Sequence, residues 1–203
     1  MVMDDTKLEP DSPDNSENLA TVWQSAAGNV IELIYDEFYW SSQMLDSFAP
    51  VSTRLLDHMD QQFVGDGIRL GLLLCGDAHI QDLNNRFRGQ DKPTNVLSFP
   101  EPEDTVSRPP LETEKGDSGP VFFGEIAIAQ QTSLGESVAM GIGFDDHLAH
   151  LFVHGVMHLL GYDHENDDDA HEMETHETAI LAAFSIADPY AGSDPAARQG
   201  VIS

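Results

Sequence analysis

Residues 154–164 read HGVMHLLGYDH, and this stretch determines one helix of the fold and the metal chemistry that the helix can carry. His154 and His158 are four residues apart, so on a helix both imidazoles lie on one face and can reach one cation. Gly161 permits the positive φ that reverses the chain and brings His164 back to the same ion. Three protein nitrogens leave the fourth position of a tetrahedral zinc ion open to water or substrate, as in catalytic zinc sites. The stretch therefore predicts a metal-binding helix, a glycine turn and one catalytic zinc ion.

Neighbouring residues offer other ligands. His150 lies four residues before His154 and would form an alternative pair with it. We favour His154 with His158, because His150 is too far along the helix axis to share an ion with His158 and His164. Asp163, adjacent to the third ligand, is a candidate to orient a histidine from behind the metal. The other histidines are expected to be exposed: His58, His79, His147, His171 and His176.

Outward from this helix, the chain alternates between strand-like and helix-like segments. Short apolar runs predict strands at 30–35, 68–75, within 92–100 and at 122–129. Helical spacing predicts helices at 44–63, 77–87, 130–140, 145–159 and 167–186, the second capped by Asp77 and ended by Gly89. The fold class that follows is α+β, a small mixed β-sheet packed against helices.

Length and composition predict a single domain. The chain has 203 residues, of which 40% are hydrophobic, which is enough for one core. Residues 1–18 are acidic and interrupted by prolines, and we expect them to be disordered. Residues 19–187 are expected to form the domain, with an acidic loop at about 101–119. Residues 188–203 are expected to be a disordered tail.

Charge and cysteine content restrict the partners and the compartment. The formal net charge of −27 repels polyanions, so a nucleic-acid site needs local cations. Cys75 has no second cysteine to pair with, and in its apolar run a buried, unreactive thiol is expected. The first residues lack the basic start and apolar stretch of a signal peptide, and no apolar run is long enough to cross a bilayer. We therefore expect a cytoplasmic protein with no membrane partner.

Three separated blocks resemble the YbeY family of zinc-dependent endoribonucleases. They are LNNRFRGQDKPTNVLSF at 83–99, GEIAI at 124–128 and the histidine stretch at 154–164. The resemblance implies an α+β fold, zinc on His154, His158 and His164, and an arginine in the cleft that corresponds to Arg88. It also implies maturation of the 3′ end of small-subunit ribosomal RNA and a role in ribosome quality control. The implied partners are single-stranded RNA, ribosomal RNA and the ribosome.

The first of these blocks also has the charge that RNA requires. Arg86, Arg88 and Lys92 place three of the nine basic residues within seven positions, a positive patch on a negative chain. Arg88 can offer two donors to phosphate oxygens and stabilise the charge that grows in the transition state. Arg86 is better explained as an exposed cation at a helix end. With zinc polarising a phosphoryl oxygen or activating water, the sequence predicts a single-strand-specific endoribonuclease.

The sequence leaves two alternative functions open. The histidine spacing matches zinc proteases, but Gly155 stands where they carry the glutamate that acts as general base. Its absence disfavours a metalloprotease-like hydrolase. A non-enzymatic zinc-containing ribosome-assembly factor would instead close the metal with a fourth protein ligand.

Overall fold

The computed structural model describes residues 18–102, 119–164 and 166–191. The strands are β1 (Asn18–Gln24), β2 (Val30–Asp36), β3 (Ile68–Cys75), β4 (Val96–Pro100) and β5 (Val121–Ala129). The helices are α1 (Ser42–Met59), α2 (Asp77–Arg88), α3 (Gln130–Met140), α4 (Phe144–Leu159) and α5 (Asp167–Ala183). A π-helical turn, η2 (Asp60–Val64), continues α1.

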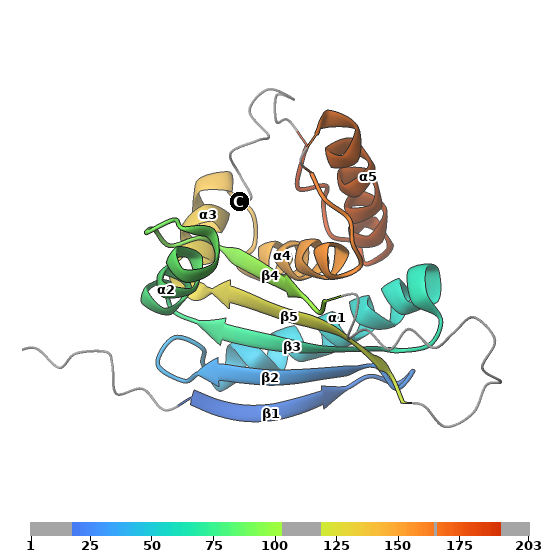
Figure 1. The fold of residues 1–203 in the computed structure, drawn as a ribbon, viewed down its shortest axis with the longest axis horizontal. Coiled ribbons are helices and arrows are strands. Elements are labelled where there is room, and N and C mark those ends of the chain that lie inside the picture. The colour runs from blue at the N-terminus through green and yellow to red at the C-terminus, as the bar shows by residue number, and fades with distance from the viewer. Residues whose placement is uncertain (1–17, 103–118, 165, 192–203) are drawn as a thin grey trace, which may run out of the picture.

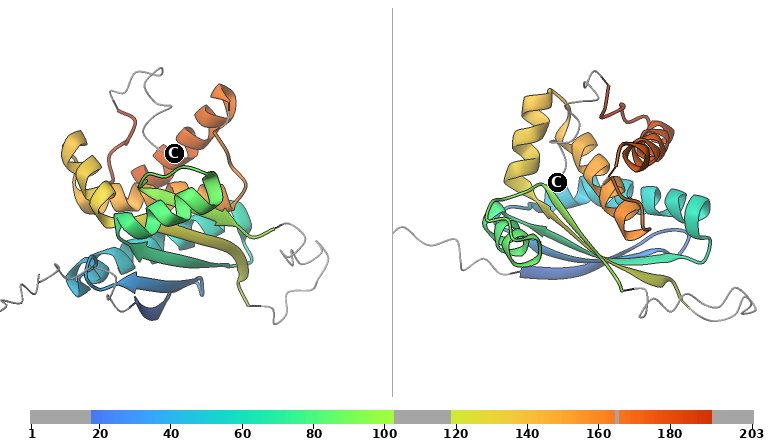
Figure 2. Two further views of the ribbon diagram at one scale, coloured as in Figure 1. Left: turned by 60° about the vertical axis from the view of Figure 1, so that its left-hand side comes forward. Right: turned by 45° about the horizontal axis from the view of Figure 1, so that its top comes forward.

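The five strands form one mixed sheet in the order β1-β2-β3-β5-β4 (Figure 1). The three central strands run parallel, and β1 and β4 are antiparallel to their neighbours at the two edges. Helices α1 and α4 cover the same face of this sheet, and α5 packs on α4 farther from the strands (Figure 2). The predicted α+β fold with a small mixed sheet is confirmed.

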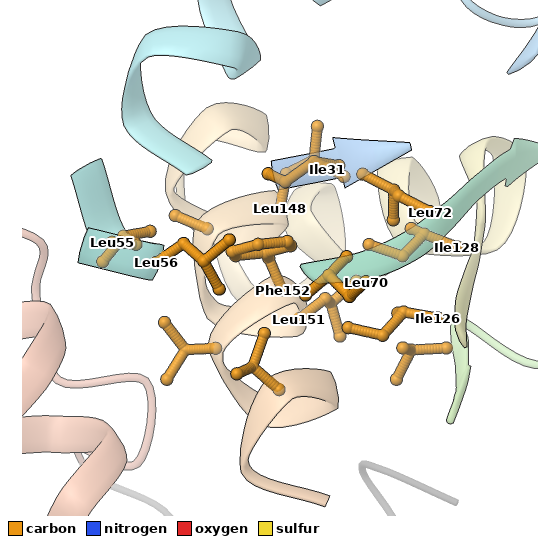
Figure 3. Close-up of a cluster of buried hydrophobic side chains, with 14 of the residues drawn as sticks. Ile31, Leu55, Leu56, Leu70, Leu72, Ile126, Ile128, Leu148, Leu151 and Phe152 are labelled. Atoms are coloured by element: carbon orange, nitrogen blue, oxygen red, sulfur yellow. The ribbon is translucent and has the colours of Figure 1, made fainter. Parts of the chain in front are cut away.

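The core lies between this covered face and helices α1 and α4. In β2 the side chains of Ile31 and Leu33 are buried while Glu32 between them is exposed, as expected for a strand with one covered face. Phe152 of α4 lies at the centre of the core among leucines and isoleucines from the sheet and α1 (Figure 3). Its ring meets that of Phe48 edge-on at a centroid distance of 5.9 Å.

Helix α4 is buried on nearly all its sides, since α1, α3, α5 and the strands β4 and β5 all contact it. Its apolar residues therefore have partners in every direction, and the helix is held in place along its length. A rigid helix of this kind is a suitable scaffold for side chains that must keep a fixed geometry.

Three local features differ from what the sequence predicted. The strand β1 was not anticipated, because nearly all its side chains are exposed and its anchor is Trp23, whose ring packs edge-on against Phe48 at 6.1 Å. Helix α2 has Gly76 as its N-cap, and Asp77 instead accepts hydrogen bonds from the backbone N–H and the hydroxyl of Thr132. Helix α5 ends at Ala183, three residues before the predicted limit.

Most of the predicted disordered segments lie outside the described residues, which exclude 1–17, 103–118 and 192–203. The division into extension, domain and tail stays a prediction. In the described part of the chain, none of the helices combines the length and apolar character needed to span a membrane.

Candidate metal centre

The predicted histidine triad comes together at the end of α4. One ligand atom each of His154, His158 and His164 lies within 4.8 Å of the other two. Gly161 adopts a φ of +93°, and its N–H donates to the carbonyl of His158 at 3.0 Å, so the chain reverses as predicted. The N–H of Tyr162 then donates to the carbonyl of Met157 at 3.1 Å, and this hydrogen bond completes the turn. The glycine turn is confirmed, and the three imidazoles form a group that can hold a metal ion.

Hydrogen bonds orient two of the rings. Nδ1 of His158 lies 3.0 Å from the carbonyl oxygen of Tyr162, which can only accept, so this nitrogen carries the proton. Nδ1 of His154 lies 2.8 Å from Oε1 of Glu177. Burial alone would raise the pKa of Glu177, but the bonds from His150 and His154 outweigh it and hold that pKa well below its usual range. The carboxylate is therefore ionised and His154 donates to it.

These bonds leave two lone pairs facing each other. Burial lowers the pKa of His154, and burial together with the neighbouring histidines lowers that of His158 to about 4, so both rings are neutral at pH 7. Nε2 of His154 and Nε2 of His158 are 3.0 Å apart. Two acceptors at this distance repel unless a cation lies between them, and two nitrogens on one tetrahedral zinc would be about 3.3 Å apart. The donor set fits zinc.

The triad opens into a pocket of about 530 Å³. Arg88, from the last turn of α2, and Ser98 and Pro100, from β4, line it together with the histidines. The Ser98 hydroxyl donates to the carbonyl of Gly155 at 3.3 Å, which ties the edge strand to α4. Arg88 is exposed, and within residues 18–102, 119–164 and 166–191 it forms no ion pair. Its guanidinium is available to an anion in the pocket.

The two other cations of the basic segment do not line this pocket. Arg86 lies 3.7 Å from Asp82 in an exposed ion pair, and its guanidinium stands over the ring of Phe87. This arrangement agrees with the interpretation of Arg86 as a solvated helix-end cation.

The triad is open toward the pocket on one side. Among the residues that the structure describes, no fourth histidine, cysteine or carboxylate joins the triad. Asp163 is adjacent, but its carboxylate accepts the backbone N–H of His164 at 2.7 Å and so shapes the turn. An open coordination position is typical of a catalytic metal site.

The prediction that His147 is exposed was wrong. Its side chain is 1% exposed, and its Nε2 lies 2.9 Å from Oε2 of Glu136 on α3. His150 is also buried, between Glu177 and Tyr190, and is not part of the triad. Both histidines lie on faces of α4 that neighbouring segments cover, which helical spacing alone does not reveal.

Glu177, the carboxylate behind His154, was not predicted as a site residue. A signal for it existed: in α5 Glu177 is spaced by four residues from Met173 and Leu181, on the buried stripe of the helix. An acid at such a position requires a buried partner.

Most of the chain is similar to known proteins. A family model described as Endoribonuclease YbeY matches residues 39–185. The chain belongs to the YbeY family. A YbeY relative in Rhodopseudomonas palustris is 51% identical over 128 residues, which are 63% of this chain and 63% of the relative. The YbeY relative in Agrobacterium fabrum is 40% identical over 164 residues, 77% of this chain and 91% of its own length.

A solved structure supports the fold. The solution structure of TM1509 from Thermotoga maritima is 24% identical, with a TM-score of 0.50, and the superposition covers 81% of this chain and 97% of that protein. The YbeY match includes all the candidate metal ligands and Arg88, whereas β1, β2 and Tyr190 lie outside it.

Proposed function

We propose that this chain is a metal-dependent endoribonuclease that cleaves single-stranded RNA in the pocket at the end of α4. Membership of a family described as Endoribonuclease YbeY supports the reaction class. The observation that carries the proposal is the pair of facing Nε2 lone pairs, 3.0 Å apart, in the same pocket as Arg88, which forms no ion pair with the described residues. A cation site next to an exposed guanidinium is suited to a phosphodiester.

The candidate metal ligands, the groups behind them and Arg88 have separate roles in this proposal. His154, His158 and His164 would hold one zinc ion, which when bound supplies a Lewis acid for a phosphoryl oxygen. Glu177 and the carbonyl of Tyr162 keep the first two rings in the ligating tautomer. Arg88 would bind two phosphate oxygens and stabilise the charge that develops as the P–O bond breaks.

The substrate follows from the charge and shape of the pocket. With a net charge of −27, most of the molecule repels RNA, so binding depends on the few cations near the pocket. An unpaired strand can bend to bring one phosphate to Arg88, whereas the grooves of an A-form duplex present it less readily. In line with the family resemblance, we extend the proposal to the 3′ end of small-subunit ribosomal RNA, ribosome quality control and the ribosome as partner, in the cytoplasm.

The test compares metal content and RNA cleavage in the wild type, His158→Ala, Arg88→Ala and Arg86→Ala. Substrates are a single-stranded RNA and the same sequence annealed to its complement. We expect His158→Ala to lose metal and cleavage, and Arg88→Ala to keep metal but lose cleavage by about 100-fold or more. Arg86→Ala is the matched control, because it removes an equal charge two residues away and outside the pocket.

Full cleavage by both His158→Ala and Arg88→Ala would overturn the proposal. Equal losses in Arg88→Ala and Arg86→Ala would replace the specific role of Arg88 with a general effect of charge. Cleavage of the duplex as fast as the single strand would reject the substrate class.

A further inference from the structure

A buried carboxylate behind the metal centre joins three elements of the fold. Glu177 is 0% exposed, and its Oε1 accepts from Nδ1 of His154 at 2.8 Å. Its Oε2 accepts from the hydroxyl of Tyr190 and lies 3.4 Å from Nε2 of His150. Both oxygens of one side chain are thus occupied, one by a metal-site histidine and the other by a tyrosine from beyond α5.

The burial of this carboxylate requires all of these partners. Transfer of an ionised carboxylate from water to a protein interior is unfavourable unless hydrogen bonds replace its hydration. Glu177 lies between the buried side chains of Met173 and Leu181 on α5, which offer no hydrogen bond. Loss of one donor therefore leaves the carboxylate free to rotate or to draw water, and either change moves the ring of His154.

Tyr190 reaches Glu177 because the chain folds back after α5. The backbone N–H of Tyr190 donates to Oδ1 of Asp188 at 2.8 Å, and the hydroxyl of Thr178 donates to the same oxygen at 3.3 Å. These bonds fasten the segment to α5. Burial and the adjacent Glu177 raise the pKa of the Tyr190 hydroxyl well above its usual range, so it remains a donor. Tyr190 lies five residues beyond the region that matches the YbeY family, residues 39–185.

We propose that Glu177 is a positioning residue for the metal ligand His154 and that Tyr190 clamps Glu177, so that residues 184–191 form part of the metal centre. The inference rests on the proposed function, since it assumes that His154 binds a metal. A carboxylate behind a ligating histidine fixes its tautomer and orientation and increases its basicity. The hydrogen bond from Tyr190 in turn fixes the position of the Glu177 carboxylate.

The chain contains a matched control for this arrangement. On the same helix, His147 is paired with Glu136 at 2.9 Å, a distance close to that of the pair formed by His154 and Glu177. His147 does not belong to the metal triad. Removing the charge of Glu136 or of Glu177 therefore distinguishes an effect on the metal ligand from a general effect on the stability of α4.

The experiment measures zinc affinity by competition with a chromophoric chelator in the full chain, without RNA. We expect Glu177→Gln to weaken zinc binding about 10–100-fold and Tyr190→Phe to weaken it about tenfold. Glu136→Gln should remain within about twofold of the wild type. Two further readouts accompany the affinities: the visible spectrum of the cobalt(II)-substituted protein, expected to change in Glu177→Gln and Tyr190→Phe alone, and the midpoint of thermal unfolding without metal.

Tyr190→Phe is the decisive variant, because it removes a single hydroxyl from a partly exposed side chain. Zinc affinity and cobalt spectrum equal to the wild type in Tyr190→Phe would overturn the clamp. Equal weakening in Glu136→Gln and Glu177→Gln would overturn the positioning role. If the wild type bound no zinc, the proposed function would fail together with this inference. If the wild type bound zinc and the variants bound it equally well, only this inference would fail.

Discussion

Gly155 of α4 lies directly against Ile126 of β5. A Cβ atom at position 155 would stand 2.9 Å from Cγ2 and 3.0 Å from Cδ1 of that isoleucine, closer than such atoms ordinarily approach. Position 155 therefore faces Ile126 of the sheet, in space that is already filled. A glutamate at this position has no room, which argues against the metalloprotease alternative.

Gly155→Ala should destabilise the protein through this contact. We expect the free energy of unfolding to fall by about 1–3 kcal/mol, as for other additions to a filled core. Urea denaturation measures the change. Gly135→Ala is the control: Gly135 lies on the exposed side of α3 with nothing within 4 Å of the added methyl group, so it should gain up to about 1 kcal/mol.

A second substitution sharpens that test. Ile126→Val shortens the side chain that a Cβ at position 155 would meet. The double variant should therefore lose less stability than the sum of the two single variants. Simple additivity would show that the two residues do not compete for space.

Gly161→Ala should affect both folding and metal binding. Its φ of +93° is unfavourable for alanine, and the added methyl group meets nothing within 4 Å, so the cost is that of the backbone, about 1–2 kcal/mol. Relief of this strain would displace His164, and zinc affinity should fall with it. Gly141→Ala, at a φ of +69° in equally open space after α3, should show the same loss in thermal unfolding with unchanged zinc affinity. Equal zinc affinities in the two variants would argue against the role of the turn in placing His164.

The Cys75 thiol should be unreactive in the folded protein. Burial, with Asp36 and Asp77 nearby, raises the pKa of Cys75 from 9.0 to about 12. At pH 8 a thiol reagent should label the chain only after urea is added. Because the unfolded thiol ionises first, its contribution to stability is intact below pH 9 and is lost as the pH rises toward 12. Cys75→Ala should lack this part of the alkaline decline, so identical pH profiles for the two proteins would contradict the prediction.

Zinc should stabilise the folded chain by mass action. At a free zinc concentration 100 times the dissociation constant, the free energy of unfolding should rise by about 2.7 kcal/mol. Differential scanning calorimetry with and without zinc measures this shift. His158→Ala should show no shift, and His79→Ala, which removes an exposed histidine outside the triad, should retain it. A shift of equal size in His158→Ala would indicate that zinc binds elsewhere.

Local patterns predicted most of the elements of this fold. The apolar run at 68–75 and the helical spacing at 145–159 were sufficient, because strands and helices with a buried side repeat their apolar residues at fixed intervals. The strand β1 escaped prediction for the opposite reason: it has little buried surface, and its pairing with β2 supplies the hydrogen bonds that define it. Its existence depends on a neighbour, which no local pattern encodes.

For the site, the sequence alone determined the group of three histidines and its turn. Two histidines at helical spacing, a glycine and a third histidine all lie within eleven residues, so local backbone geometry is enough to bring them together. Only the tertiary structure decided which groups surround the triad. Arg88 reaches the pocket from another helix, and Glu177 and Tyr190 approach His154 from segments 23 or more residues away. Such contacts arise when α2, α4 and α5 pack, and packing depends on the whole core.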